Sequence, residues 1–158
     1  MDDQSILCAV AVVGLHSYNG TDVGAPVIDC NRTGRAFNLK GAEAVPARHV
    51  DGGAAQQRRV RIEGLIVRRG ISEQGGGAVY SDSVELVVRS CSFEDCSSVG
   101  SALPDGGGGG GSIFVRNAPF TSDKSNFTDC TAAVAMASTS TRWSGGGAVM
   151  VFGKALWD

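Results

Sequence analysis

The segment at residues 75–96, GGGAVYSDSVELVVRSCSFEDC, is the best guide to the fold because both of its ends recur further along the chain. Its triple glycine returns as GGGSI at 109–113 and as GGGAV at 145–149. Its last five residues, SFEDC, return as NFTDC at 126–130.

The spacing between the two motifs is the same in both copies. Gly77 lies 16 residues before Phe93, and Gly111 lies 16 residues before Phe127. The step from Gly77 to Gly111 therefore equals the step from Phe93 to Phe127. Two different motifs that keep one period predict a chain of stacked structural repeats.

An earlier and weaker copy of the apolar pattern lies upstream. The pattern Leu86-x-Val88-x-x-Cys91-x-Phe93 matches Val60-x-Ile62-x-x-Leu65-x-Val67, at a shorter offset than the later period. The runs at 26–30 and 35–39 are interpreted as two more short strands. Because the repeat length varies while the apolar spacing is fixed, the pattern indicates a solenoid in which loops bulge between coils. The expected bulges are 40–58, 101–108 and 131–144.

Composition supports an all-β chain. The 158 residues include 23 glycines, and 42% are hydrophobic but only 6% aromatic, which suits short strands joined by tight turns. Apolar residues alternate within each motif, so one set points inward, and the glycine pairs are expected at sharp corners. We therefore predict one parallel β-helix domain over 1–158, with about four coils and its clearest repeats in 60–152.

The end of the chain interrupts the pattern. The phenylalanine partner of the third glycine motif would fall beyond Asp158. We therefore expect the last coil to be incomplete, and further β-helix coils of the same protein to be partners.

Charge and hydropathy argue against several functions. The formal net charge is −2, which gives no indication of a nucleic-acid partner. Residues 32–69 nevertheless hold nine Lys or Arg against three Asp or Glu, and residues 70–130 hold three against eight.

The longest apolar run, 6–13, is shorter than the ~20 residues that a bilayer requires, so no transmembrane segment is predicted. Residues 1–5 are acidic, unlike a signal peptide, so we predict a buried strand at 9–13.

Cysteines and sequons bear on compartment and cofactors. None of the five cysteines forms a C-x2-C pair, and His16 and His49 are isolated, so we predict neither a metal site nor a cofactor. Three N-x-S/T sequons, at Asn19, Asn31 and Asn126, are glycosylation candidates that favour an extracellular or cell-surface location.

These motifs resemble the pectin-lyase-like right-handed parallel β-helix superfamily, most closely the polymorphic outer-membrane-protein type of repeat with its GGAI and FxxN motifs. GGAV, GGSI and GGAV stand at 76–79, 110–113 and 146–149, and FEDC and FTDC stand at 93–96 and 127–130, with cysteine in place of asparagine. The resemblance implies a right-handed β-helix. It also implies a non-catalytic domain of a secreted or cell-surface protein, with a structural, adhesive or glycan-binding role and with glycans or other surface proteins as partners.

The alternative is an enzyme, because similar β-helices include lyases and hydrolases that act on acidic polysaccharides. Asp95 and Asp129 are equivalent in the period, and Arg69 matches them one coil earlier. This column is a weak candidate for an acid–base pair with a tuning arginine. The Asn-Thr-Asp and Gly-His-Gly signatures of polygalacturonases are absent from the sequence, so we predict that the chain is not an enzyme.

The same offsets align Gly70, Cys96 and Cys130. Cys96 and Cys130 should therefore be neighbours on successive coils, at a spacing that a disulfide tolerates. Two states fit this geometry, a ladder of reduced thiols or a coil-to-coil disulfide, and a local pairing of Cys91 with Cys96 is the rival.

Overall fold

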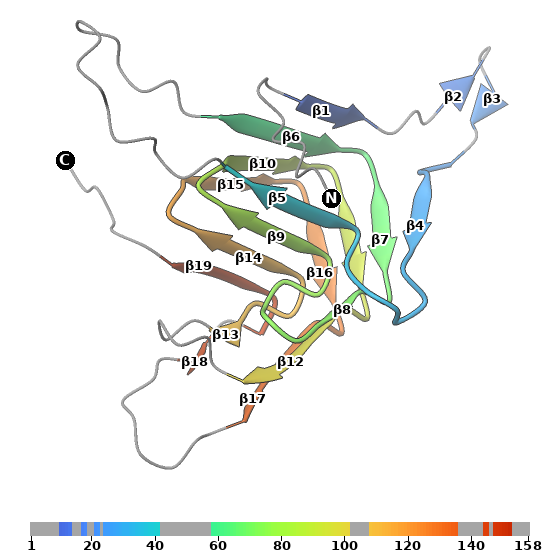
Figure 1. Ribbon diagram of the computed structural model, residues 1–158. Coiled ribbons are helices and arrows are strands. Elements are labelled where there is room, and N and C mark those ends of the chain that lie inside the picture. The colour runs from blue at the N-terminus through green and yellow to red at the C-terminus, as the bar shows by residue number, and fades with distance from the viewer. Residues whose placement is uncertain are drawn as a thin grey trace, which may run out of the picture.

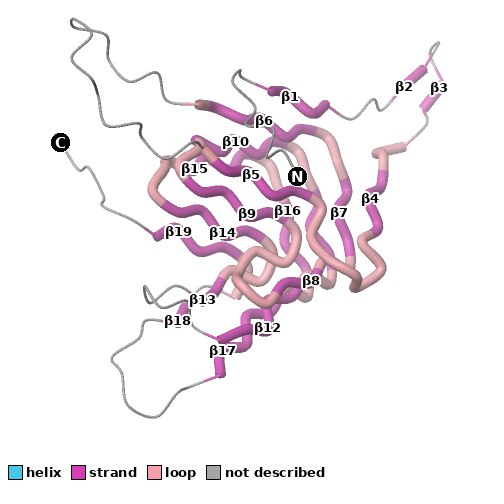
Figure 2. Tube along the Cα trace, viewed as in Figure 1, coloured by secondary structure: helices cyan, strands magenta, loops and turns pink. Residues whose placement is uncertain are grey.

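The computed structural model describes residues 10–13, 17–18, 21–22, 24–41, 58–101, 108–135, 144–145 and 147–152. Within these residues the chain is all-β, and its strands stack into parallel sheets that wind as a parallel β-helix of about four coils (Figures 1 and 2). No helix in this part of the chain has the length and apolarity needed to cross a membrane.

Four parallel sheets form the walls. Sheet 1 contains β1 (Val10–Val13), β6 (Arg59–Glu63), β10 (Glu85–Arg89) and β15 (Phe120–Asp123). Sheet 2 contains β4 (Val27–Asp29), β7 (Ile66–Arg68), β11 (Ser92–Glu94) and β16 (Asn126–Thr128). Sheet 3 contains β5 (Phe37–Lys40), β9 (Val79–Asp82), β14 (Ile113–Arg116) and β19 (Val149–Phe152). Sheet 4 contains β8 (Ile71–Ser72), β12 (Ser97–Ser101) and β17 (Thr131–Ala135).

Two smaller pairs complete the described strands. β13 (Gly108–Gly109) pairs in parallel with β18 (Ser144–Gly145), and β2 (Ser17–Tyr18) forms an antiparallel pair with β3 (Thr21–Asp22). Coil 1 then contains β1, β4 and β5, coil 2 runs from β6 to β9, coil 3 from β10 to β14, and coil 4 from β15 to β19.

The register confirms both offsets read from the sequence. Val88 pairs with Ile62 of the preceding coil, and Phe93 pairs with Phe127 of the following coil. The rings of Phe93 and Phe127 stack with centroids 5.2 Å apart and planes 8° apart. Equivalent side chains therefore lie directly above one another in successive coils.

The core fills the space enclosed by sheets 1, 2 and 3. In the middle coils the core is closed to solvent, and the following side chains are 0% exposed: Ile62, Val67, Val79, Leu86, Val88, Phe93, Ile113 and Val115. Full burial of one such side chain contributes roughly 1.5–3 kcal/mol, so the stacked apolar columns are the main source of stability.

The corners use more than glycine. Gly76 and Gly110 do turn the chain with positive φ, 64° and 65°, as the glycine motifs predict. Other corners place non-glycine residues in the left-handed region, at equivalent positions of successive coils: Ser83 and Asn117, Ser90 and Lys124, and Arg69, Asp95 and Asp129. Several of these are short polar residues, and Asn and Asp adopt this conformation more readily than bulkier residues because their side chains can hydrogen-bond locally.

The expected bulges are only partly within the described residues. Residues 42–57, 102–107 and 136–143 lie outside them. The first five residues of the third expected bulge are instead strand β17, because Thr131–Ala135 continues sheet 4 beside β12. The expected incomplete end of the last coil, after Phe152, also lies outside.

Candidate functional site

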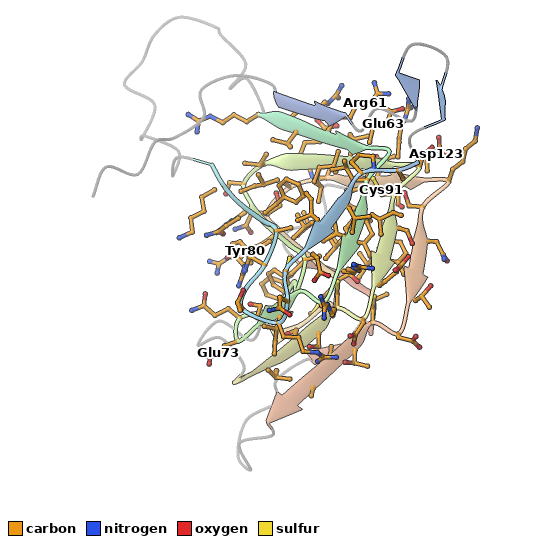
Figure 3. The ribbon with its side chains drawn as sticks, turned by 90° about the vertical axis from the view of Figure 1, so that its right-hand side faces the viewer. Arg61, Glu63, Glu73, Tyr80, Cys91 and Asp123 are labelled. Atoms are coloured by element: carbon orange, nitrogen blue, oxygen red, sulfur yellow. The ribbon has the colours of Figure 1, made fainter. Side chains whose placement is uncertain are left out.

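Charges on the outer face of sheet 1 alternate in sign from coil to coil. Glu63, Arg89 and Asp123 occupy one register column, and Nε of Arg89 lies 3.9 Å from Oδ2 of Asp123. Glu63 also pairs with Arg61 of its own strand (Figure 3). In a neighbouring column, Nε of Arg59 lies 2.8 Å from Oε2 of Glu85.

Sheets 2 and 3 show the same alternation. Lys40, Asp82 and Arg116 follow one another in sheet 3, and Nε of Arg116 lies 3.8 Å from Oδ2 of Asp82. Asp29, Arg68 and Glu94 follow one another in sheet 2. Each exposed pair contributes at most about 1 kcal/mol, but like charges directly opposite would be destabilising. The columns therefore favour the observed register more than they add stability.

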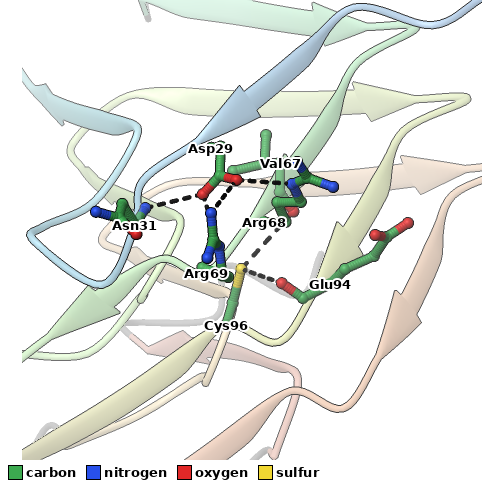
Figure 4. A network of polar contacts seen from close by, with 7 residues as sticks. All are labelled: Asp29, Asn31, Val67, Arg68, Arg69, Glu94 and Cys96. Carbon is green, nitrogen blue, oxygen red and sulfur yellow. Dashed lines mark hydrogen bonds and ion pairs between the residues drawn. The ribbon is translucent and has the colours of Figure 1, made fainter.

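A denser network surrounds Asp29 at the end of sheet 2 (Figure 4). Nε of Arg69 donates to Oδ1 of Asp29 at 2.8 Å, and a second nitrogen of the same guanidinium donates to Oδ2. Arg68 donates to Oδ2 at 2.9 Å, and the backbone N–H of Asn31 donates to Oδ1 at 2.9 Å. The hydrogen bond from Arg69, followed by that from Asn31, holds the pKa of the Asp29 carboxyl well below its usual range.

Ion pairs occupy two members of the predicted acid–base column. Arg69, Asp95 and Asp129 do adopt equivalent left-handed corners, with φ of 54°, 50° and 53°. Arg69, however, is turned toward Asp29. A terminal guanidinium nitrogen of Arg32 donates to both carboxylate oxygens of Asp95, at 2.7 Å each.

The carboxylate of Asp129 has no partner among the described residues. The arrangement therefore holds ion pairs between coils, and it does not present two free carboxyls flanking one space, as glycoside hydrolysis requires.

The second cluster is the pair formed by Cys96 and Cys130. The backbone N–H of Thr131 donates to the Cys96 carbonyl oxygen at 2.9 Å, which sets the two cysteines on adjacent coils. Cys96 is 0% exposed, and Cys130 is half-buried and accepts a hydrogen bond from Oγ of Ser112 at 2.7 Å. Hydrogen bonding between the two thiols lowers the pKa of Cys130 and raises that of Cys96.

All four described cysteines are free thiols: Cys30, Cys91, Cys96 and Cys130. Cys8 lies outside the described residues. Cys91 occupies a different corner, where its Sγ lies 3.1 Å from the Arg89 carbonyl oxygen. The coil-to-coil disulfide stays a prediction for oxidising conditions, since adjacent strands are ~4.8 Å apart.

Two of the three sequons lie in the described chain, and both asparagines are exposed. Asn31 stands at the coil 1 corner with φ of 47°. Asn126 stands in β16, where its Nδ2 donates to Oγ1 of Thr128 at 3.1 Å. Asn19 lies outside the described residues, and glycosylation stays a prediction for all three.

Sequence reasoning missed Asp29 and Arg32, the coil 1 partners of Arg69 and Asp95. The step from Asp29 to its register partner Arg68 differs from both offsets found downstream, so neither offset leads to it. The available signal was the apolar pair Val27 and Ile28 before an aspartate, aligned against Ile66 and Val67 before an arginine. No group of three or more His, Cys, Asp or Glu in the described ranges is arranged to hold a metal ion.

Fold and site together define a class, a parallel β-helix repeat protein whose outward charges are paired between coils. Comparison with known proteins adds no family to this class. No family model matches the chain, and neither a curated protein nor a solved structure matches it.

Proposed function

We propose that this chain is a non-catalytic β-helix domain of a secreted or cell-surface protein, of the polymorphic outer-membrane-protein type that its GGAI-like and FxxN-like motifs resemble. Its role is structural, adhesive or glycan-binding, with glycans or other surface proteins as partners. The observation that carries the proposal is the pairing of outward charges from coil to coil, because it engages the acidic and basic side chains in ion pairs within the domain.

Two further features support this role. Two of the three residues of the predicted acid–base column are held in ion pairs, since Arg69 binds Asp29 and Arg32 binds Asp95. The exposed Asn31 and Asn126 are suitable glycan acceptors if the protein passes through a secretory pathway.

The proposal predicts the outcome of one experiment on immobilised polysaccharides. The chain is incubated with polygalacturonate and calcium, and with neutral glycans, and both retention and unsaturated or reducing products are measured. We expect no product above the blank with any polymer. Retention without product would indicate a glycan-binding role. The absence of both retention and product would indicate a structural role.

Catalysis would contradict the proposal. The decisive observation would be turnover that is lost in the double variant Asp95→Asn and Asp129→Asn but kept in Asp123→Asn. Asp123 is the matched control, because it is an exposed aspartate of the same coil as Asp129. Equal thermal midpoints of the variants would exclude unfolding as the cause.

A further inference from the structure

A pair of thiols lies at the corner that follows sheet 2, where it belongs to the apolar core. Cys96 of coil 3 is a core residue, Cys130 of coil 4 packs against that core, and the two thiols hydrogen-bond to each other. The Sγ of Cys96 also lies 3.4 Å from the Glu94 carbonyl oxygen and 3.8 Å from that of Val67 (Figure 4). The two sulfur atoms therefore share one site, although they come from different coils.

A buried hydroxyl group is placed against this pair. Ser112 is 0% exposed, and its Oγ donates to the Sγ of Cys130 at 2.7 Å. The register places Ala78 of coil 2 and Ala148 of coil 4 at the equivalent position of the glycine motif, so the backbone there does not require serine. A buried hydroxyl costs free energy unless it is hydrogen-bonded, and a donor to sulfur favours the thiolate form. Ser112 therefore stabilises negative charge on Cys130.

The spacing of the pair suits a metal ion held between the two sulfur atoms. The strands before and after the pair, β11 with β16 and β12 with β17, are paired in register, and such strands lie ~4.8 Å apart. A metal–thiolate bond is about 2.3 Å long in zinc sites, so an ion midway between two thiolates holds them about 4.6 Å apart. The coil spacing and the sulfur spacing that such an ion needs are therefore nearly equal.

The donor set favours soft ions of low coordination number. Thiolate sulfur selects Cu(I) among the ions of the first transition row, whereas structural Zn²⁺ takes four ligands. The described residues supply two thiols here, and no group of three or more His, Cys, Asp or Glu among them is arranged to hold a metal ion. Two sulfur ligands in line are the preferred coordination of Cu(I) and Ag(I). No spacing in the sequence indicates this site, because its ligands come from different coils.

We propose that the reduced pair Cys96 and Cys130 binds one Cu(I) ion as a linear bis-thiolate that links coil 3 to coil 4. Each thiol gives up its proton to solvent, two sulfur–copper bonds form, and copper keeps its oxidation state. Ser112 is a positioning residue, which orients the Cys130 sulfur and stabilises its charge. The inference goes beyond the proposed function and is independent of it. The site needs only coils 3 and 4, whatever precedes or follows them in the protein.

The test titrates the reduced 158-residue chain with Cu(I) under anaerobic conditions, in competition with a chromophoric Cu(I) chelator. We expect one tightly bound ion per chain, with two sulfur neighbours and no nitrogen or oxygen neighbour in its X-ray absorption spectrum. The thermal midpoint should rise, because an ion that binds only the folded state stabilises that state. Cys96→Ala and Cys130→Ala should each abolish tight binding, and Cys130→Ala changes the less buried of the two positions.

Three further variants serve as controls. Cys91→Ala removes a buried thiol at another corner and should leave copper binding unchanged. Cys30→Ala should do the same, since Cys30 belongs to coil 1 and is not a ligand in this proposal. Ser112→Ala introduces the residue that coils 2 and 4 have at this position, so the fold should be kept. Its copper affinity should fall about tenfold or more, the range for removing a hydrogen-bond partner of a metal ligand.

Three results would overturn the proposal. The first is a reduced, folded chain that does not retain Cu(I) against the chelator. The second is tight binding that persists in Cys130→Ala, which would assign the ion to another cysteine. The third is a third sulfur neighbour that disappears in Cys30→Ala, which would replace the two-ligand site by a different one.

Discussion

Replacing Phe93 by alanine is expected to lower the free energy of unfolding by about 3–5 kcal/mol, the range for removing a large aromatic side chain from a packed core. Phe93 is 0% exposed, and it lies between Val67 of coil 2 and Phe127 of coil 4. Both neighbours are held by backbone hydrogen bonds, so the cavity cannot collapse easily.

The matched control is Phe127→Ala, which removes the same atoms from the equivalent position one coil later. Phe127 is partly exposed, so we expect a loss of roughly 1–2 kcal/mol. Urea denaturation of both variants, followed by circular dichroism, gives the comparison. Equal losses would show that Phe127 is packed as closely as Phe93 and would contradict its greater exposure.

Replacing Gly77 by alanine is expected to have a still larger effect, about 4 kcal/mol or more, or to prevent folding. An added Cβ would overlap the Ser97 carbonyl oxygen and would lie 2.5 Å from the Gly111 carbonyl oxygen and 2.7 Å from the Ser97 nitrogen. All three contacts are backbone atoms, which belong to sheet 4 and to the next glycine motif and cannot move independently.

Gly147 provides the control, because it is the equivalent glycine of the third motif. Among the described residues, an added Cβ there meets only the Cys130 carbonyl oxygen, at an ordinary 3.6 Å. We expect the free energy of unfolding of Gly147→Ala to lie within about 1 kcal/mol of that of the parent chain. A Gly77→Ala variant as stable as Gly147→Ala would mean that the glycine motif does not bring successive coils into close contact.

The fold of coils 2 to 4 could be predicted from the sequence because their inner positions are apolar and keep a fixed spacing. Val60, Leu86 and Phe120 share one column, and a slip by one residue would turn such apolar side chains to the other face of the sheet. The corners were less predictable. The glycine pairs were expected at the sharp corners, but Asp95 and Ser90 also adopt the left-handed conformation. Residues other than glycine can take this conformation when the surrounding structure holds them in it.

The candidate site could be predicted only in part. The period of the later repeats correctly placed Asp95 and Asp129 at equivalent corners, with Arg69 at the same corner one coil earlier. It could not identify Asp29 and Arg32 as their partners, because coil 1 joins coil 2 at a different offset and its apolar runs are short. The alternation of charge could not be predicted from the sequence either, because it is visible only when the strand pairs are known.

Equivalent residues of successive coils are expected to lie in direct contact. Nuclear Overhauser measurements on the reduced chain, with labelled phenylalanine and valine, would detect these contacts. The structure predicts contacts from the Phe93 ring to the Val67 methyl groups of the coil before it and to the Phe127 ring of the coil after it. Contacts of Phe93 and Phe127 with different neighbours and none with each other, as an antiparallel sandwich would give, would contradict the stacked coils and the charge columns that depend on them.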